Sequence, residues 1–228
     1  ESTRFLISGC SNDQEIQIIK CVFTNCQASN ADGGAILYNM DGKFTVHGTI
    51  FTGCSANSGG AIEAKGTNGN AKSFHSHYCC YTSCTCGTGN SHLGSAIHAQ
   101  FTDLEVNYSA TLYCPAGQAT AHGAQIDLTS VNFVASSHIN STHGRAEYCS
   151  GIEYRSGKSG FFKFQNLVNH EGSFITALND LGGSVEISNY NIVNVNVTSK
   201  AGFPGVIFVL KTGVTLSDII VFGVTFAE

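Results

Sequence analysis

Two short phrases recur as a pair along the first half of this chain. Phe-Thr-Asn-Cys at residues 23–26 precedes Gly-Gly-Ala-Ile at 33–36, and Phe-Thr-Gly-Cys at 51–54 precedes Gly-Gly-Ala-Ile at 59–62. Looser copies are Ile-Ser-Gly-Cys at 7–10, and Tyr-Thr-Ser-Cys at 81–84 with Gly-Ser-Ala-Ile at 94–97. Recurrence at a period of roughly thirty residues indicates a chain that stacks short units along one axis.

The units have the pattern of β-strands. Apolar Phe44 and Val46 alternate with polar Thr45 and His47, which is the period of two typical of a strand. The chain has 26 Gly, 2 Pro and no Trp in 228 residues, a composition that favours strands and turns. The isoleucines that mark the second strand of each unit recur at uneven spacing: Ile36, Ile62, Ile97, Ile126, Ile152, Ile175 and Ile207. Persistent strands joined by turns of variable length indicate a parallel β-helix.

We therefore predict an all-β fold, a parallel β-helix (solenoid) of about eight coils, with residues 1–228 forming a single domain. In such a helix each strand lies directly above the strand of the coil before it, so that like side chains form columns. Phe23, Phe51 and Tyr81 are expected in one column, and the isoleucines in another.

The two repeated phrases resemble the repeat motif of a known family of surface proteins. Gly-Gly-Ala-Ile paired with Phe-x-x-Asn is the repeat signature of the polymorphic outer-membrane proteins, and the chain resembles that family over roughly residues 5–100. It departs from the signature because Cys26 and Cys54 stand at the Asn position. The resemblance implies a right-handed, single-stranded parallel β-helix at a cell surface or outside the cell, with adhesion as its role.

Charge and composition narrow the function further. The net charge is −5 and Lys and Arg are scattered, which disfavours nucleic acid as a partner. No apolar run reaches the ~20 residues of a membrane span, so we expect no membrane insertion. Ten Cys and three glycosylation sequons favour a secreted, extracellular or cell-surface protein. The sequons predict glycans at Asn107, Asn140 and Asn196.

Four cysteines fall at the same place in successive units, namely Cys10, Cys26, Cys54 and Cys84. Adjacent members would have Cα atoms ~4.7–4.9 Å apart, inside the ~4.4–6.8 Å window for a disulfide. We predict the bridges Cys10–Cys26 and Cys54–Cys84, with Cys26–Cys54 as the competing pair. The alternative is a column of buried free thiols that pack as small hydrophobic side chains.

No cofactor and no metal site are predicted. Four thiols between residues 79 and 86 lie close in sequence, but an oxidising compartment favours disulfides over zinc. His75 and His77 share one strand face, and His47 is expected beside His77 if Phe51 stacks on Tyr81. Paired histidines on a strand can hold a metal, but an exposed polar face accounts for them equally simply.

A second set of residues directly follows the column isoleucines. Leu37 comes first, and the later members are Glu63, His98, Asp127 and Glu153. The neighbour of an inward residue on a strand points outward, so we expect these side chains in a line on a solvated face. Glu63 and Asp127 would lie two coils apart, within the ~6.5–9.5 Å that separates the carboxylates of an inverting glycosidase.

The expected function is that of a secreted or cell-surface structural or adhesive module with long flat contact faces. Its partners would be other copies of itself, or host or cell-surface protein or glycan. Residues 1–10 and 213–228 leave open coils, so we expect either a piece of a longer β-helix or subunits that stack end to end into a fibre.

The alternative is a polysaccharide lyase or glycoside hydrolase that acts on an extracellular polysaccharide. Its catalytic residues would be Glu63, Asp127, Glu153 and His98. Pectin-degrading β-helix enzymes, which this architecture also resembles, use clustered Asp with Arg or Lys. This chain has no Asp-Asp pair and just three Arg, which favours the non-enzymatic role.

Overall fold

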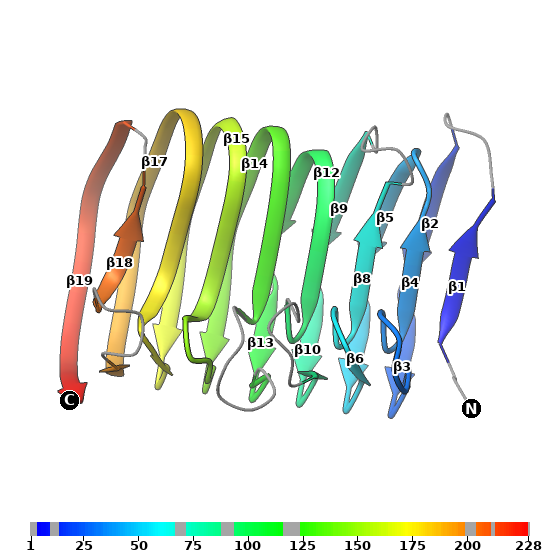
Figure 1. The fold of residues 1–228 in the computed structure, drawn as a ribbon, viewed down its shortest axis with the longest axis horizontal. Helices are drawn as coiled ribbons and strands as arrows, with labels where there is room; N and C mark the ends of the chain where they lie inside the picture. The colour runs from blue at the N-terminus through cyan, green and yellow to red at the C-terminus, as the bar shows by residue number, and fades with distance from the viewer. Residues whose placement is uncertain are drawn as a thin grey trace.

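The computed structural model is a parallel β-solenoid of about seven turns, against the eight predicted. It describes residues 4–9, 14–66, 72–87, 94–115, 124–198, 204–210 and 213–227, with the backbone alone for 156 and 180–182. Figure 1 shows the turns side by side along one axis, with the two termini at opposite ends. No helix occurs within the described ranges.

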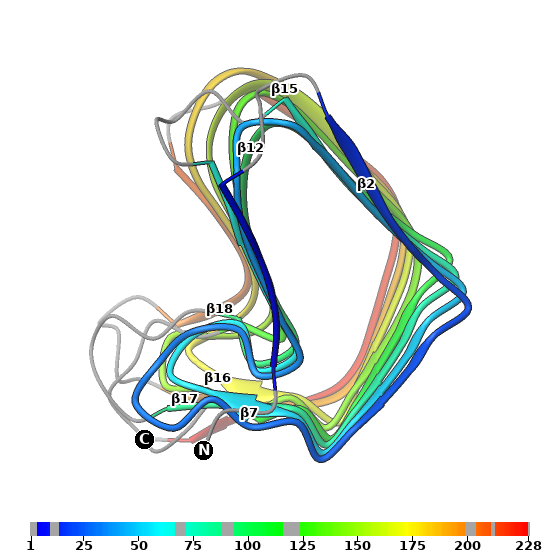
Figure 2. The same ribbon diagram turned by 90° about the vertical axis from the view of Figure 1, so that its right-hand side faces the viewer.

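Seen along the axis, the turns superimpose as a three-sided tube with a smaller lobe beside one side (Figure 2). The first face contains β1 (Phe5–Ser8), β4 (Ile36–Asn39), β8 (Ile62–Lys65), β18 (Gly205–Val209) and the opening parts of β12 (Ile97–Asn107), β14 (Ile126–Thr142), β15 (Cys149–Val168) and β17 (Phe174–Thr198). The second face contains β2 (Glu15–Ile19), β5 (Lys43–His47), β9 (Ser73–His77), later parts of the four long strands and the start of β19 (Gly213–Ala227). The third face contains β3 (Val22–Thr24), β6 (Ile50–Thr52), β10 (Cys80–Thr82), β13 (Ala110–Leu112) and further parts of β14, β15, β17 and β19. The lobe includes β7 (Ser55–Ala56), β11 (Thr85–Cys86) and β16 (Glu171–Gly172).

The predicted columns are confirmed. Phe23, Phe51 and Tyr81 are partners on consecutive rungs, and their rings stack with centroids 5.1 and 4.9 Å apart. The isoleucine column also runs in register from Ile36 to Ile152. These inward side chains form one continuous core, in which Phe23 is half-buried and the others are buried, because each turn covers the apolar side chains of the next.

Two details of the predicted alignment are wrong. Thr176, and not Ile175, continues the isoleucine column, because a register shift between Cys149 and Ile152 displaces the next strand by one residue. The half-copy at residues 7–10 does not belong with the Phe phrases, because Ile7 pairs with Tyr38 on the first face. Its Cys10 lies outside the described residues.

The Gly-Gly-Ala-Ile phrase has a steric cause. Gly59 has φ +59°, and a Cβ there would collide with the carbonyl oxygen of Ile62. A Cβ on Gly60 would collide with the carbonyl oxygen of Ser95 on the adjacent turn. The first glycine therefore permits the left-handed turn, and the second permits the close approach of the next rung.

The corner between the second and third faces is made by single residues in the left-handed conformation. Tyr78, Tyr108, His138 and Phe164 have φ between 50° and 56° there. Their rings stack outside the tube, with centroids 4.9, 4.4 and 4.6 Å apart along the column. Face-to-face packing between turns offsets part of the cost of a left-handed non-glycine residue.

Replacement of Phe51 by Ala removes a buried ring from between two stacked partners. We expect the free energy of unfolding to fall by about 3–5 kcal/mol, measured as a shift of the urea midpoint. Ile50→Ala is the matched control, because Ile50 is the adjacent residue and is 45% exposed. Equal losses in the two variants would contradict the stacked column.

Candidate functional site

The four charged candidates of the first face do form a ladder. Glu63, His98, Asp127 and Glu153 are register partners on consecutive rungs of β8, β12, β14 and β15. We call them the buried charge ladder, because their exposed fractions are 1, 4, 0 and 1%. The expectation of a solvated face was therefore wrong. These side chains do point away from the tube core, but the lobe lies beside this face and a second layer covers them.

Glu63 and His98 form one half of the ladder. Glu63 Oε2 lies 2.8 Å from His98 Nδ1 and accepts a hydrogen bond of 3.0 Å from Ser58, a residue of the lobe. Lys65 Nζ lies 3.4 Å from the other carboxylate oxygen. Burial by itself raises the pKa of Glu63 and lowers that of His98, but their mutual attraction outweighs it. The pKa of Glu63 is lowered and that of His98 raised, so each group stabilises the charged form of the other.

Asp127 and Glu153 form the other half, with Arg155 between them. Arg155 lies 2.5 Å from Asp127 Oδ2 and 3.1 Å from Glu153 Oε1. Asn179 donates a hydrogen bond of 3.2 Å to Glu153 Oε1. Asp127 Oδ1 and Glu153 Oε2 are buried and have no hydrogen-bond partner within the described structure. Burial, and then the charge of Asp127, raise the pKa of Glu153 to about 8.

This half has the components of acid–base chemistry. Glu153, which keeps its proton near neutral pH, lies one rung, ~4.8 Å, from the carboxyl group of Asp127. The guanidinium of Arg155 contacts both carboxyl groups. Such an acid can donate a proton to a leaving group. However, the side chains of Asp127 and Glu153 are 0 and 2% exposed, so a polymer cannot contact them in this conformation.

The cysteine column is also present, with Cys114 as a member that was not predicted, whereas Cys10 lies outside the described residues. Cys54 and Cys84 follow one another on adjacent rungs, next to Cys26 on one side and Cys114 on the other. In place of the predicted Cys54–Cys84 bridge, Cys54 and Cys84 are both free thiols, which also contradicts the competing Cys26–Cys54 pair. The predicted Cys10–Cys26 bridge stays a prediction, because Cys10 lies outside the described residues. The Cys54 and Cys84 thiols donate to the carbonyl oxygens of Phe23 and Phe51 at 3.8 and 3.9 Å.

Neighbouring thiols and burial set the chemistry of this column. The hydrogen bond with Cys84, followed by burial, raises the pKa of Cys54, and the hydrogen bond with Cys114 raises the pKa of Cys84. Both are therefore thiols at neutral pH and weak nucleophiles. The packed-thiol alternative describes them in this structure.

The sequons differ in accessibility. Asn107 is 7% exposed, and its amide donates to Glu105. Asn140 is exposed on the third face, and Asn196 is half-buried. Glycosylation stays a prediction at all three, with Asn140 the most accessible in the folded chain.

Sequence reasoning missed four partners of the ladder: Ser58, Lys65, Arg155 and Asn179. Lys65 and Arg155 lie two residues after Glu63 and Glu153, on the same side of their strands. The alternation of side chains along a strand could therefore have predicted both contacts. Ser58 contacts the ladder because the lobe lies beside the first face, and no pattern in the neighbouring sequence predicts that contact. Cys114 lies thirty residues after Cys84, and the repeat period alone would have placed it.

Comparison with protein-family models, curated proteins and solved structures finds no match to this chain. Assignment therefore stops at the fold, a parallel β-solenoid of about seven turns. Within the described ranges, no helix has the length and apolar character needed to cross a membrane.

Glu153→Gln tests the raised pKa. The folded chain binds the Glu153 proton more tightly than the unfolded chain does between the ordinary pKa of 4.5 and the folded value of about 8. Ionisation of Glu153 therefore lowers the free energy of unfolding as pH rises through that window, and Gln removes this loss. We expect the stability of the variant relative to the wild type to rise by roughly 2–4 kcal/mol between pH 5 and pH 7.5, measured by urea denaturation at each pH.

Glu171→Gln is the control for this measurement. Glu171 pairs with Arg145 in an exposed ion pair, so its relative stability should change by less than about 1 kcal/mol. Parallel pH profiles for wild type and Glu153→Gln would show that Glu153 is not protonated at neutral pH.

Proposed function

We propose that the chain is an extracellular or cell-surface structural and adhesive module that makes contact through the outward side of its third face. We call this side the uncharged face. It has two outward columns of one residue per rung. The first contains Val22, Ile50, Cys80, Ala110, Asn140, Asn166, Asn191 and Ile220. The second contains Thr24, Thr52, Thr82, Leu112, Thr142, Val168, Val193 and Phe222.

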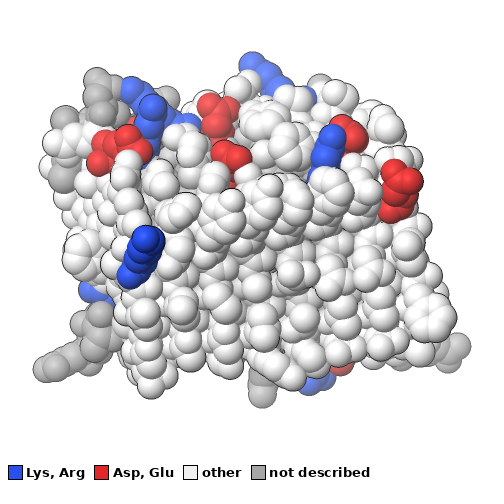
Figure 3. Space-filling view, turned by 180° about the vertical axis from the view of Figure 1, so that it is seen from behind, with Lys and Arg blue, Asp and Glu red and all other residues white. Residues whose placement is uncertain are grey.

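The absence of charge from both columns is the observation that carries the proposal. In Figure 3, charged side chains gather along the upper part of the view, over the second face, and the lower part is nearly free of them. Solvated faces of soluble proteins normally carry charge, whereas the centres of protein contact surfaces are depleted in it. A flat surface of Thr, Asn and aliphatic groups over the length of the solenoid therefore favours a contact role.

The side chains of this face are also held in place. Asn166 donates to Asn140 at 3.2 Å, and Asn191 donates to Asn166 at 2.8 Å, which forms an amide ladder across three turns. The aromatic stack from Tyr78 to Phe164 borders the same face. Ordered amides and rigid rings lose little conformational entropy when a partner binds.

The repeat signature supports the location. Its likeness to the polymorphic outer-membrane proteins, surface β-helix adhesins, favours a right-handed β-helix that is displayed or secreted. Host or cell-surface protein or glycan would be the partner of the uncharged face. A glycan at Asn140 would cover the centre of this face, so the adhesive role and the glycan predicted at Asn140 exclude one another.

A second candidate is a polysaccharide lyase or glycoside hydrolase that uses the buried charge ladder. The raised pKa of Glu153 beside Asp127 and Arg155 favours it, since strongly shifted carboxyl groups concentrate at active sites. The burial of both carboxylates is the observation against it.

Charge placed on the uncharged face tests the adhesive role. The probes are arrays of extracellular-matrix proteins and of glycans, and the readout is binding of the labelled chain. We expect binding by the wild type and a loss of at least about tenfold in Thr52→Lys and Thr142→Lys, because a desolvated charge opposes contact. Thr45→Lys, on the outward side of the second face, is the matched control and should bind as the wild type does.

Two results would overturn the proposal. One is equal binding by all variants. The other is release of new reducing ends or unsaturated products from polysaccharides by the wild type but not by Glu153→Gln, which would establish the enzymatic candidate instead.

We further propose that copies of the chain stack end to end. On β19, Leu216 and Val221 continue the inward columns of Ile187 and Ile192, yet they are 55 and 44% exposed. A further rung, supplied either by a second copy or by more of a longer β-helix, would bury them and pair the open edge of the strand. Sedimentation velocity should show rod-like multimers that grow with concentration and are lost in Leu216→Glu. A monomer at every concentration would contradict end stacking.

A further inference from the structure

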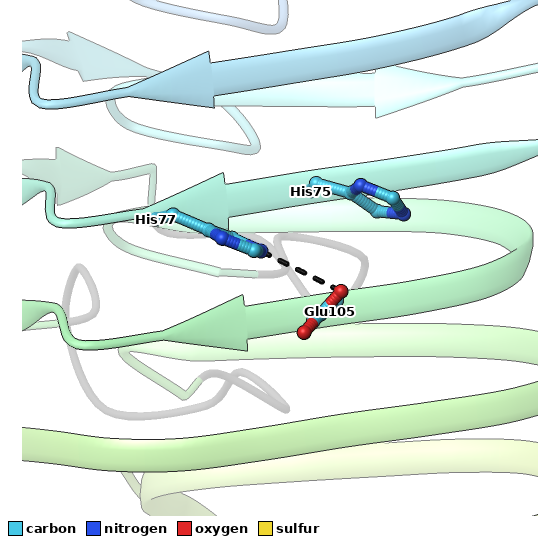
Figure 4. A group of neighbouring side chains, drawn as sticks. All are labelled: His75, His77 and Glu105. Atoms are coloured by element: carbon cyan, nitrogen blue, oxygen red, sulfur yellow. Dashed lines mark ion pairs between the residues drawn. The ribbon is translucent and has the colours of Figure 1, made fainter.

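Two histidines and a glutamate meet on the outward side of the second face (Figure 4). His75 and His77 come from β9, and Glu105 comes from β12 on the next turn. We propose that these three side chains bind a divalent transition-metal ion, Zn²⁺ in the first instance. The site lies apart from both the buried charge ladder and the uncharged face.

Strand alternation places the three ligands. In β9, Phe74 and Ser76 are buried inward, so His75 and His77 point outward. The register sets Glu105 directly opposite His75 and diagonal to His77. One carboxylate therefore faces two imidazoles across a single rung.

The distances suit a small ion. One ligand atom from each residue lies within 4.8 Å of the others, and His77 Nε2 lies 3.6 Å from Glu105 Oε2. A tetrahedral zinc site with bonds of 2.0–2.1 Å sets its ligand atoms about 3.3 Å apart. Small side-chain rotations are enough to close the cluster around the ion.

The glutamate is already oriented by a second layer of hydrogen bonds. Asn107 Nδ2 donates to Glu105 Oε1 at 2.5 Å, which leaves Oε2 directed at His77. Ser137 Oγ in turn donates to Asn107 Oδ1 at 2.8 Å. Outer partners of this kind fix the geometry of metal-binding carboxylates.

The nitrogen that would bind the ion is available. His77 Nε2 is buried and has no hydrogen-bond partner within the described structure. A buried polar atom without a partner is costly, and a bound ion would satisfy it.

The donor set selects the class of ion. Two imidazole nitrogens and one carboxylate oxygen suit Zn²⁺ and its neighbours, whereas Ca²⁺ and Mg²⁺ prefer sites made of oxygen. Three protein ligands leave a coordination position for water. Because the ion would join β9 to β12, it would also clamp two successive turns.

The experiment compares Zn²⁺ binding by the wild type with two ligand variants and one control. His77→Gln and Glu105→Gln each remove one ligand, whereas His138→Gln replaces an exposed histidine of the corner stack. By calorimetry, we expect the wild type and His138→Gln to bind one more Zn²⁺ per chain than either ligand variant. Zn²⁺ should also raise the Tm of these two proteins and not that of the ligand variants.

Co²⁺ substitution separates this site from the thiols of the chain. Ions held by nitrogen and oxygen give a tetrahedral cobalt spectrum without the near-ultraviolet sulfur-to-cobalt band. That spectrum, present in wild type and lost in His77→Gln, supports the proposal. Equal Zn²⁺ stoichiometry and Tm shifts in all four proteins, or a spectrum dominated by the sulfur band, would overturn it.

Discussion

Parallel pairing of each strand with the strand of the turn before it, in register, places every side chain of this solenoid. Because each rung repeats the one before it, every outward and inward position becomes a column, and a column can bury, stack or align whatever side chain it holds. Inside the tube, the rings of Phe23, Phe51 and Tyr81 stack from rung to rung and form part of the core. Outside the tube, the aromatic residues of the corner stack in the same way. The same rule brings together the charges, the thiols and the metal-ligand cluster.

The repeat period allowed much of this to be predicted. The Phe and Ile columns, the order of the charge ladder and the position of His47 beside His77 all follow from aligning one unit with the next. The alignment of successive units was wrong where the spacing of the repeated phrases changes. A register shift moved Ile175 out of its column, and the strand at residues 5–8 proved to belong to a different face.

The burial of the charge ladder could not be predicted from alternation. A strand pattern distinguishes inward from outward, but it does not tell which outward faces a second layer covers. Here the lobe lies beside the first face, and Ser58 hydrogen-bonds to Glu63 there. Once covered, the charges needed partners, and Lys65 and Arg155 supply them two residues along the same strands. The three outward faces therefore differ in kind: one is charged and covered, one is charged and exposed, and one is exposed without charge.

In-register stacking predicts contacts between threonine methyl groups on consecutive rungs of the third face. Thr24, Thr52 and Thr82 are outward partners on three successive turns. With methyl-labelled threonine, and Thr52→Ser to assign the signals, nuclear Overhauser effects should connect the methyl of Thr52 to those of Thr24 and Thr82. Thr24 and Thr82, two rungs or ~9.6 Å apart, should show no direct contact. Absence of both Thr52 contacts, or a direct Thr24–Thr82 contact, would show that the turns do not stack in this register.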